Sequence, residues 1–428
     1  MEKKGYKSAF GIVTTLFFMW GFLTCLNDIL VPHLKAVFDL NYTRVMLIQF
    51  TFFAAYFIMS IPAGKVIARL GYQKGVVVGL ATGGIGALMF YPAAGMMSYP
   101  LFLTALFVLA TGITVLQVAA NPYAAVLGKP ETASSRLNLA QAVNSLGHTT
   151  APLIGGLLIL GTTLTAAQVA ALPAAEQHAA KLAKAASVQM PYLWLAGALF
   201  LLAVVMGLIK LPVIDAVENH NTKSAKLRDA LKYRHLRLAA LGIFLYVGAE
   251  VSIGSFLVNF FGQPEIAGLV EATAAGFVSY YWGSAMVGRF IGSALLQKLK
   301  PRQVLAVAAT VASLLVFTTI FISGSAAMFT ILAVGFFNSV MFPIIFTLGI
   351  EDLGNLTSQG SSILVMAIVG GAIIPVLQGA LADSIGIHHA FILPALCYLY
   401  IIYYAVKGSR HVQRSATEPA TVSETVAA

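Results

Sequence analysis

The sequence has little charge for its length. Lys, Arg, Asp and Glu together make up 10% of its 428 residues, whereas soluble globular proteins contain about 25%. Hydrophobic residues reach 59%, and the mean hydropathy is +0.85. A chain with so few charged side chains cannot cover a water-exposed surface, so most of it must lie in lipid. The composition excludes ordinary soluble, disordered, fibrous and disulfide-rich proteins, and it indicates a polytopic helical membrane protein.

Motifs for nucleotide, metal or covalent chemistry are also missing. The two cysteines, Cys25 and Cys397, lie in apolar runs and form no C-x-x-C pair. The chain has no G-x-x-x-x-G-K-[ST] motif for ATP phosphates, no His, Cys and carboxylate spacing typical of a metal site, and no nucleophile elbow. We therefore expect no enzymatic reaction, no cofactor and no metal site. Membrane orientation explains the net charge of +10 better than nucleic-acid binding does.

Apolar stretches long enough to cross a bilayer, at about 20 residues each, form two groups of six. They fall at 9–32, 45–64, 75–96, 100–122, 137–160, 191–211, 237–261, 272–297, 303–323, 325–350, 358–381 and 388–407. The sequence thus predicts an all-α protein with an N-terminal six-helix bundle at 1–211 and a linker at 212–236. A C-terminal six-helix bundle follows at 237–410, and then a disordered tail at 411–428.

Basic residues fall almost entirely on one side of these spans. With a cytoplasmic N-terminus, Lys35, Arg44, Lys181 and Lys184 are the only Lys and Arg residues on the opposite side. Because cytoplasmic loops carry an excess of Lys and Arg, both termini, the linker and the tail are predicted to be cytoplasmic.

The two halves also resemble each other. The loop after the second span reads GKVIARLGYQKG (64–75), and the loop after the eighth reads GRFIGSALLQKLKPRQ (288–303). Matching glycines and basic residues in a six-plus-six plan favour two parallel repeats with a binding site between them, as in major facilitator transporters. The alternative is that any cytoplasmic loop collects Lys and Arg.

A carboxylate inside the membrane requires a functional or structural explanation, because a charged side chain at a helix centre costs about 2.5–3.5 kcal/mol. Asp28 shares a helical face with Trp20, Thr24 and Asn27 on the first span. We predict that Asp28 takes up and releases a coupling proton, with Asn27 beside it in the site. An inert, hydrogen-bonded Asp28 at the outer end of the span is the alternative.

Amides form a second polar stripe. Span five carries Asn138, Gln141, Asn144, Ser145 and His148 at helical spacing, and span four adds Gln117 and Asn121. Amides both donate and accept hydrogen bonds, as a neutral polyol requires, so we predict that Gln117, Gln141 and Asn144 bind substrate. The alternative is hydrogen bonding between helices, worth only about 0.6 kcal/mol per bond.

The second half supplies fewer polar residues. Glu250 lies on span seven, and either coupling or a structural hydrogen bond explains it. We predict that Trp282 and Asn338 form the second wall of the site, although a Trp is also typical of a membrane interface. Arg289 is predicted to clamp helix ends rather than to bind substrate.

Six collinear segments give these residues a family context. They are FFMWGFLTCLNDILVPHLK, QVAANPYAAVLG, RLNLAQAVNSLG, FLYVGAEVSIGSF, FNSVMFPIIFTLGIEDLG and GSSILVMAIVGGAIIPVLQGALAD. Over nearly the whole chain the sequence resembles the fucose–galactose–glucose/proton symporter family of major facilitator proteins, which includes L-fucose permease and bacterial glucose/galactose transporters.

The resemblance implies roles for particular residues. Asp28 matches an aspartate linked to proton coupling in the fucose permease, and Asn144 matches an important asparagine. Gln117 stands where that permease has a glutamate. A glutamine there, with a glutamate at Glu250, resembles the glucose/galactose branch instead. Ala68 replaces an aspartate that is usual in the facilitator loop after span two.

We therefore expect a monomeric transporter in the bilayer of a bacterial inner membrane. It would import a neutral monosaccharide, glucose or galactose above others, with a proton by alternating access. Fucose or N-acetylglucosamine as substrate, and sodium as the coupled ion, stay open within the family. The rivals are a non-transporting membrane sugar sensor and an exporter of drugs or metabolites.

Overall fold

A computed structural model describes residues 2–38, 42–155, 172–209, 211–212 and 227–410. Within these ranges, the side chains of 2–8, 26–33, 35–36, 42–46, 152–155, 174–175 and 271–272 are outside the description. The predicted linker at 212–236 and tail at 411–428 therefore lie largely outside the described residues.

The first half is built from long apolar helices. They are α1 (Glu2–Phe38), α2 (Tyr42–Leu70), α3 (Tyr72–Gly95), α4 (Tyr99–Val126), α5 (Ala133–Gly155, after the short η1, Pro130–Thr132) and α8 (Gln189–Leu208). α4 begins at a Pro in its first turn, where the missing N–H costs nothing. Between α5 and α8 lies α7 (Ala174–Ala186).

The second half has the same kind of helices, several of them in pieces. They are α10 (Leu227–Ala230), α11 (Arg234–Phe261), α12 (Glu271–Leu295), α13 (Pro301–Phe321), α14 (Gly324–Asn338), α15 (Met341–Ile350), η4 (Gly354–Leu356), α16 (Thr357–Met366), η5 (Ala367–Val369), α17 (Gly370–Ile385), α18 (Ile387–Ala390), α19 (Ile392–Tyr403) and η6 (Tyr404–Gly408). In the described part of the chain, nine helical segments are long and apolar enough to cross a membrane.

Two predicted spans are interrupted at mid-length. Span ten divides into α14 and α15 after Asn338, and Pro343 lies in the first turn of α15. Pro343 has no N–H to bond the carbonyl of Ser339, which lies between the two helices. Span eleven divides at η5, next to the pair Gly370 and Gly371. A hydropathy average does not detect such breaks, because the residues before and after each break are apolar.

Small residues bring neighbouring helices of one half into close contact. A Cβ on Gly79 would lie 3.0 Å from Leu116 of α4, and one on Gly112 would overlap the backbone of Gly83. In the second half, a Cβ on Gly370 would overlap the carbonyl of Phe244 on α11. Close approach of this kind is how membrane helices pack without a hydrophobic driving force.

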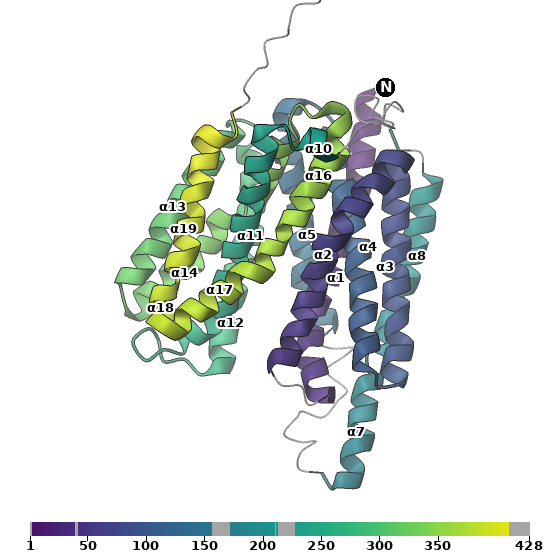
Figure 1. The fold of residues 1–428 in the computed structure, drawn as a ribbon, viewed down its shortest axis with the longest axis vertical. Coiled ribbons are helices and arrows are strands. Elements are labelled where there is room, and N and C mark those ends of the chain that lie inside the picture. The colour runs from purple at the N-terminus through teal and green to yellow at the C-terminus, as the bar shows by residue number, and fades with distance from the viewer. Residues whose placement is uncertain (1, 39–41, 156–171, 210, 213–226, 411–428) are drawn as a thin grey trace, which may run out of the picture.

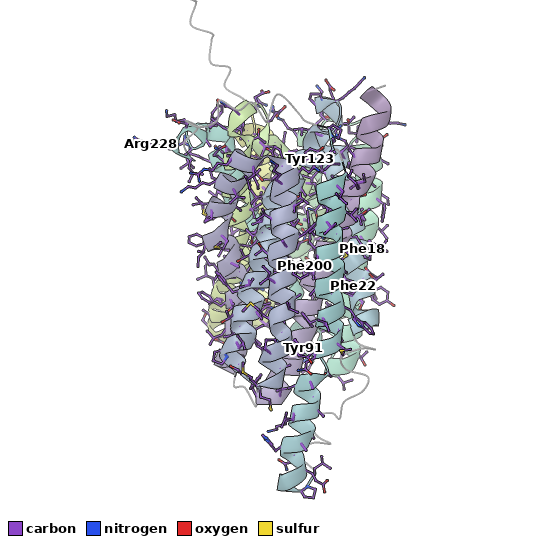
Figure 2. All side chains as sticks on the ribbon, turned by 90° about the vertical axis from the view of Figure 1, so that its right-hand side faces the viewer. Phe18, Phe22, Tyr91, Tyr123, Phe200 and Arg228 are labelled. Atoms are coloured by element: carbon purple, nitrogen blue, oxygen red, sulfur yellow. The ribbon has the colours of Figure 1, made fainter. Side chains whose placement is uncertain are left out.

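The outer surface of the molecule is apolar. Phe321 is 82% exposed and Leu208 79% exposed, which suits lipid rather than water. Figure 2 shows Phe18, Phe22 and Phe200 along the side of the long, nearly parallel helices.

The two halves meet chiefly at one end, called here the terminal end because α1 begins and η6 ends there (Figure 1). Ser134 Oγ of α5 lies 2.6 Å from Thr347 Oγ1 of α15. Ser135 Oγ donates to the carbonyl of Ser293 on α12 over 2.7 Å. Ser361 Oγ of α16 donates to the carbonyl of Val118 on α4 over 2.9 Å. Toward the opposite end, where α7 lies, the ribbons of the two halves diverge (Figure 1).

Candidate functional site

A hydrogen bond between α4 and α2 holds the first predicted binding residue. Gln117 Nε2 donates to the Tyr56 hydroxyl over 3.0 Å, and both side chains are buried. Tyr56 also bonds Thr24 of α1, whose own hydroxyl donates to the carbonyl of Trp20 over 2.8 Å. The predicted polar face of span one and the amide of span four thus meet at Tyr56, which the sequence analysis did not single out.

The amide stripe of α5 faces two different neighbours. Asn144 Nδ2 donates to the carbonyl of Phe17 on α1 over 2.9 Å, and a Cβ on Gly21 would overlap the Asn144 carbonyl. Asn138 Nδ2 instead donates to the carbonyl of Arg289, in the second half, over 2.6 Å. Gln141 lies between them and is 8% exposed. α5 therefore carries polar groups to both α1 and the opposite half.

Asn27 and Asp28 lie on α1, which is a continuous helix through them. Their side chains are outside the described residues, so the predicted proton-coupling role of Asp28 and the substrate contact of Asn27 stay predictions.

Glu250 belongs to a connected polar network inside the second half. Its Oε1 accepts a hydrogen bond from the Tyr246 hydroxyl over 2.8 Å. The Tyr281 hydroxyl contacts the Glu250 carbonyl at 3.4 Å and receives a bond from Asn338 Nδ2 over 2.8 Å. The Tyr398 hydroxyl donates to Asn338 Oδ1 over 2.7 Å. These bonds join α11, α12, α14 and α19.

Asn338 lies inside the second half in this arrangement, and its predicted contact with substrate stays a prediction. Its side chain is fully buried, and both of its polar atoms already bond tyrosines. Because Nδ2 donates to one tyrosine and Oδ1 accepts from the other, Asn338 orients Tyr281 and Tyr398 in this arrangement. Helix α14 ends at Asn338.

Trp282 and Tyr280 lie on different faces of α12. Trp282 is 44% exposed and packs against α11, where a Cβ on Gly254 would lie 3.0 Å from its ring. It shares its helix face with Met286, which Thr149 of α5 contacts at 3.6 Å. Trp282 thus lies on the side of α12 that is turned toward the first half.

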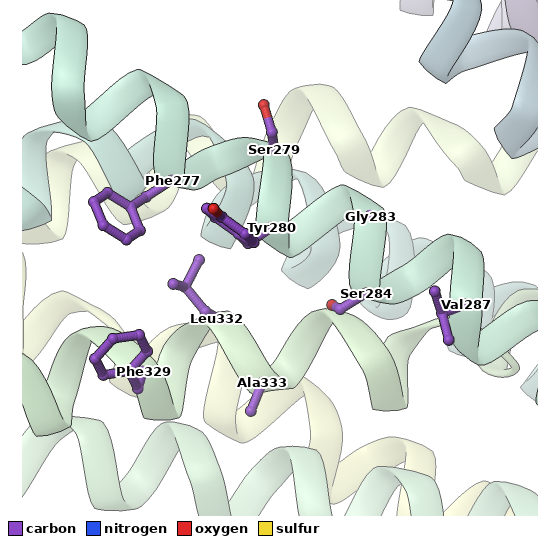
Figure 3. A pocket seen from close by; sticks show the side chains of 9 residues that line it. All are labelled: Phe277, Ser279, Tyr280, Gly283, Ser284, Val287, Phe329, Leu332 and Ala333. Atoms are coloured by element: carbon purple, nitrogen blue, oxygen red, sulfur yellow. The ribbon is translucent and has the colours of Figure 1, made fainter.

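Tyr280 instead lines an apolar groove of about 660 Å³ between α12 and α14 (Figure 3). The residues around it are Phe277, Ser279, Tyr280, Gly283, Ser284, Val287, Phe329, Leu332 and Ala333. Tyr280 is 66% exposed and Phe329 60%. The groove is formed by the second half alone and lies apart from the polar network.

Arg289 does not clamp a helix end, so that prediction was wrong. Its Nη2 lies 3.9 Å from Glu250 Oε1, and its Nη1 donates a hydrogen bond to Ser145 Oγ of α5. The guanidinium therefore joins the second half's carboxylate to the first half's stripe. Sequence spacing alone could not indicate this, because Ser145 on α5 is far in the chain from Glu250 and Arg289 on the consecutive helices α11 and α12.

Two further amides are buried without a hydrogen bond in the described part of the structure. Asn121 follows Gln117 by one turn on α4, and Gln378 lies on α17. Both side chains are fully buried, and neither polar atom of either amide has a partner among the described residues.

Known proteins resemble this chain over most of its length. A family model described as Major Facilitator Superfamily matches residues 9–368. A glucose/galactose transporter of Brucella abortus biovar 1 (strain 9-941) is 55% identical over 410 residues, 96% of each chain. The L-fucose-proton symporter of Escherichia coli K12 is 36% identical over 411 residues, 94% of each chain.

A solved structure agrees with the fold. A major facilitator superfamily transporter in the outward conformation superposes with a TM-score of 0.85 at 34% identity, over 95% of this chain and 100% of that one. The predicted twelve-helix architecture in two six-helix bundles is confirmed by this match. The chain belongs to the major facilitator superfamily and, within it, to the fucose–galactose–glucose/proton symporter family.

Proposed function

We propose that the protein is a secondary active transporter that imports a neutral monosaccharide together with a proton. This proposal rests on the presence of buried amides in the first half and of a carboxylate inside the second half. Gln117 and Asn144 are held by α2 and α1, while Glu250 is held by α11. Amides suit sugar hydroxyls, and a membrane carboxylate suits a proton.

The substrate is proposed to be a hexose of the glucose or galactose type. The Brucella relative is named a glucose/galactose transporter and is 55% identical, against 36% for the fucose symporter. Gln117 also supports this choice, since it stands where the fucose permease has a glutamate. Fucose, N-acetylglucosamine and a sodium-coupled mechanism are outcomes that the test below distinguishes.

The site is proposed to lie between the halves. Asn27, Gln117, Gln141 and Asn144 would bind the sugar from the first half, and Trp282 would stack on its apolar face from the second. Asp28 would carry the coupling proton, with Glu250 as a second titrating group. Asn338 would support the site by holding Tyr281 and Tyr398.

Hydrogen bonds join the two halves at the terminal end in this arrangement. If the basic loops face the cytoplasm, that end is the cytoplasmic one, and the ribbons of the two halves diverge toward the outside (Figure 1). We propose a monomer in the bacterial inner membrane with both termini cytoplasmic. Its bundles would span 1–211 and 237–410, joined by 212–236, with a tail at 411–428.

Transport would proceed by alternating access. The sugar and a proton enter from the diverging side, the halves close over them, and the terminal end opens. One co-transported charge supplies about 2.3 kcal/mol per 100 mV, enough for roughly 50-fold accumulation of sugar.

Counterflow in vesicles tests this function. Purified protein is reconstituted with unlabelled sugar inside, and entry of labelled glucose, galactose, fucose or N-acetylglucosamine is followed. A transporter exchanges its substrate, and the proposal expects glucose and galactose to enter fastest. A membrane sugar sensor would bind a sugar without exchanging it, and that result would reject the proposal.

A further inference from the structure

The apolar groove between α12 and α14 lies on the outer side of the second half. On α12, Arg289 contacts the first half by donating a hydrogen bond to Ser145. Tyr280 lies about two and a half turns before Arg289, so its side chain projects from the opposite side of the helix. Tyr280 and Phe329 of α14, which both line the groove, are largely exposed. In a chain that spans a membrane, this surface meets lipid, and the groove therefore opens to the bilayer.

The groove has room for a hydrocarbon chain. Its volume is about 660 Å³, and a Cβ on Gly283 would meet nothing within 4 Å. Figure 3 shows Tyr280 of α12 and Phe329 of α14 on the two sides of this space. The Ser284 hydroxyl donates to the carbonyl of Tyr281 over 2.8 Å, within its own helix. Because a polar ligand would find few hydrogen-bond partners here, the lining suits an acyl chain better.

The groove lies half-way along α12. Gly283 is the middle residue of this helix (Glu271–Leu295). The hydrocarbon core of a bilayer is about 30 Å thick, so an acyl chain from either surface ends about 15 Å deeper, near the middle of the membrane. Ser293, near the end of α12, bonds Ser135 at the terminal end. From Val287, the last lining residue of α12, the helix rises only about 16 Å to the turn that follows it. A lipid of the leaflet at the terminal end can therefore reach the groove with one chain.

A row of apolar side chains continues the groove toward the terminal end. Val287, Ile291 and Leu295 follow each other at intervals of four residues on α12, and each is close to half exposed. Residues four apart lie on one side of a helix. The row therefore offers an apolar surface to an acyl chain along its whole course from the groove to the turn after α12.

Charge distinguishes the two leaflets. Lys298 and Lys300 lie in the turn between α12 and α13, and both are exposed. Within the described part of the chain, neither lysine forms an ion pair, whereas Arg302 lies 3.9 Å from Glu351. The loop before α12, at the other end of the helix, carries the exposed Glu265 instead. Lysines at a membrane surface attract the phosphate of an anionic lipid, so the terminal end is the one that suits such a headgroup.

We propose that the groove and these two lysines form a binding site for one anionic phospholipid of the leaflet at the terminal end. One acyl chain fills the space beside Gly283 between α12 and α14, and the lipid phosphate contacts Lys298 and Lys300. The proposal requires only that the chain spans a membrane. It goes beyond the proposed function and does not depend on which solute the protein transports.

Photolabelling locates such a lipid. The full chain is placed in nanodiscs of phosphatidylethanolamine with a small fraction of phosphatidylglycerol. In separate samples, one of the two lipids carries a diazirine near the end of an acyl chain, and mass spectrometry maps the labelled residues after illumination. We expect phosphatidylglycerol to label Tyr280, Val287 and Phe329 at least about fivefold more than phosphatidylethanolamine does at equal probe concentration. Leu201, which is exposed on α8, is the reference, and both probes should label it equally.

Substitutions test the two parts of the site separately. Gly283→Leu places a side chain in the open space of the groove and should remove most of the labelling there. Gly197→Leu is the matched control, because a Cβ on this residue of α8 also meets nothing within 4 Å, and it should label as the parent does. Lys298→Gln combined with Lys300→Gln should lower labelling of the groove by phosphatidylglycerol to the level of phosphatidylethanolamine.

Three results would overturn the inference. Equal labelling of the groove by the two probes would reject an anionic lipid as its occupant. Labelling spread evenly over α12 and α8 would reject the groove as a binding site. Full labelling of the groove in Gly283→Leu would show that the acyl chain lies elsewhere. If Gly283→Leu fails to fold, the lysine variant still decides, because an unchanged ratio of the two labels in it rejects the headgroup contact.

Discussion

The side-chain amide of Gln117 on α4 and the hydroxyl of Tyr56 on α2 are joined by a hydrogen bond of 3.0 Å. Among the described residues the Gln117 oxygen has no hydrogen-bond partner, so it can accept from a ligand, and the bond to Tyr56 fixes the direction in which it points. Tyr56 is itself bonded to Thr24 on α1. Three helices of the first half therefore determine the position of one amide.

Replacement of Gln117 tests whether this amide binds sugar. Gln117→Ala should weaken binding about tenfold or more, because a lost hydrogen bond to a buried partner costs about 1–3 kcal/mol. Tyr56→Phe removes only the group that orients the amide and should weaken binding less. Isothermal titration with the sugar identified by counterflow measures both. Equal affinity in the parent and Gln117→Ala would remove Gln117 from the site.

Trp282 and Tyr280 form a matched pair for testing the second wall. They are close in sequence on α12 but lie on different faces, Trp282 toward the first half and Tyr280 in the outer groove (Figure 3). Trp282→Ala should reduce sugar affinity several-fold through lost stacking, at about 1 kcal/mol, and Tyr280→Ala should not. If Tyr280→Ala reduces affinity and Trp282→Ala does not, the stacking wall has been assigned to the wrong face.

Asp28 is tested by separating exchange from accumulation. Asp28→Asn cannot lose a proton, so counterflow of labelled sugar should continue while uphill uptake fails. The two assays use the same vesicles and differ only in the imposed gradient. Unchanged accumulation by Asp28→Asn would show that the coupling proton is carried elsewhere.

Close packing in the first half predicts a stability change. A Cβ on Gly112 would overlap the backbone of Gly83 on α3, whereas one on Gly197 of α8 meets nothing within 4 Å. Gly112→Ala should therefore destabilise the protein by about 1–3 kcal/mol, and Gly197→Ala should change its stability little. Thermal unfolding in detergent compares them. Equal melting temperatures of the two variants would mean that α3 and α4 can move apart without loss of stability.

Much of the fold follows from sequence because lipid imposes a simple rule: each span must be apolar and about 20 residues long. Span seven was expected at 237–261 and is Arg234–Phe261, and span nine was expected at 303–323 and is Pro301–Phe321. The interruptions after Asn338 and at η5 were not predicted. They depend on local backbone bonding near Pro343 and Gly370, which an average over apolar residues cannot detect.

The site was predicted less completely, for a different physical reason. Periodicity places Asn138, Asn144 and Ser145 on one face of a helix, but it does not say which neighbour each one meets. Arg289 looked like a helix-end residue because it is near a basic loop. Only the packing of α12 between α11 and α5 brings it to Glu250 and Ser145.

Uptake under imposed gradients tests the central claim most directly. Vesicles containing the purified protein receive labelled glucose or galactose with an inward proton gradient, an inward sodium gradient or neither. Proton-coupled import predicts a transient accumulation above equilibrium with the proton gradient alone, abolished by a protonophore. Accumulation driven by sodium alone would contradict proton coupling, and mere equilibration in all three conditions would contradict active transport altogether.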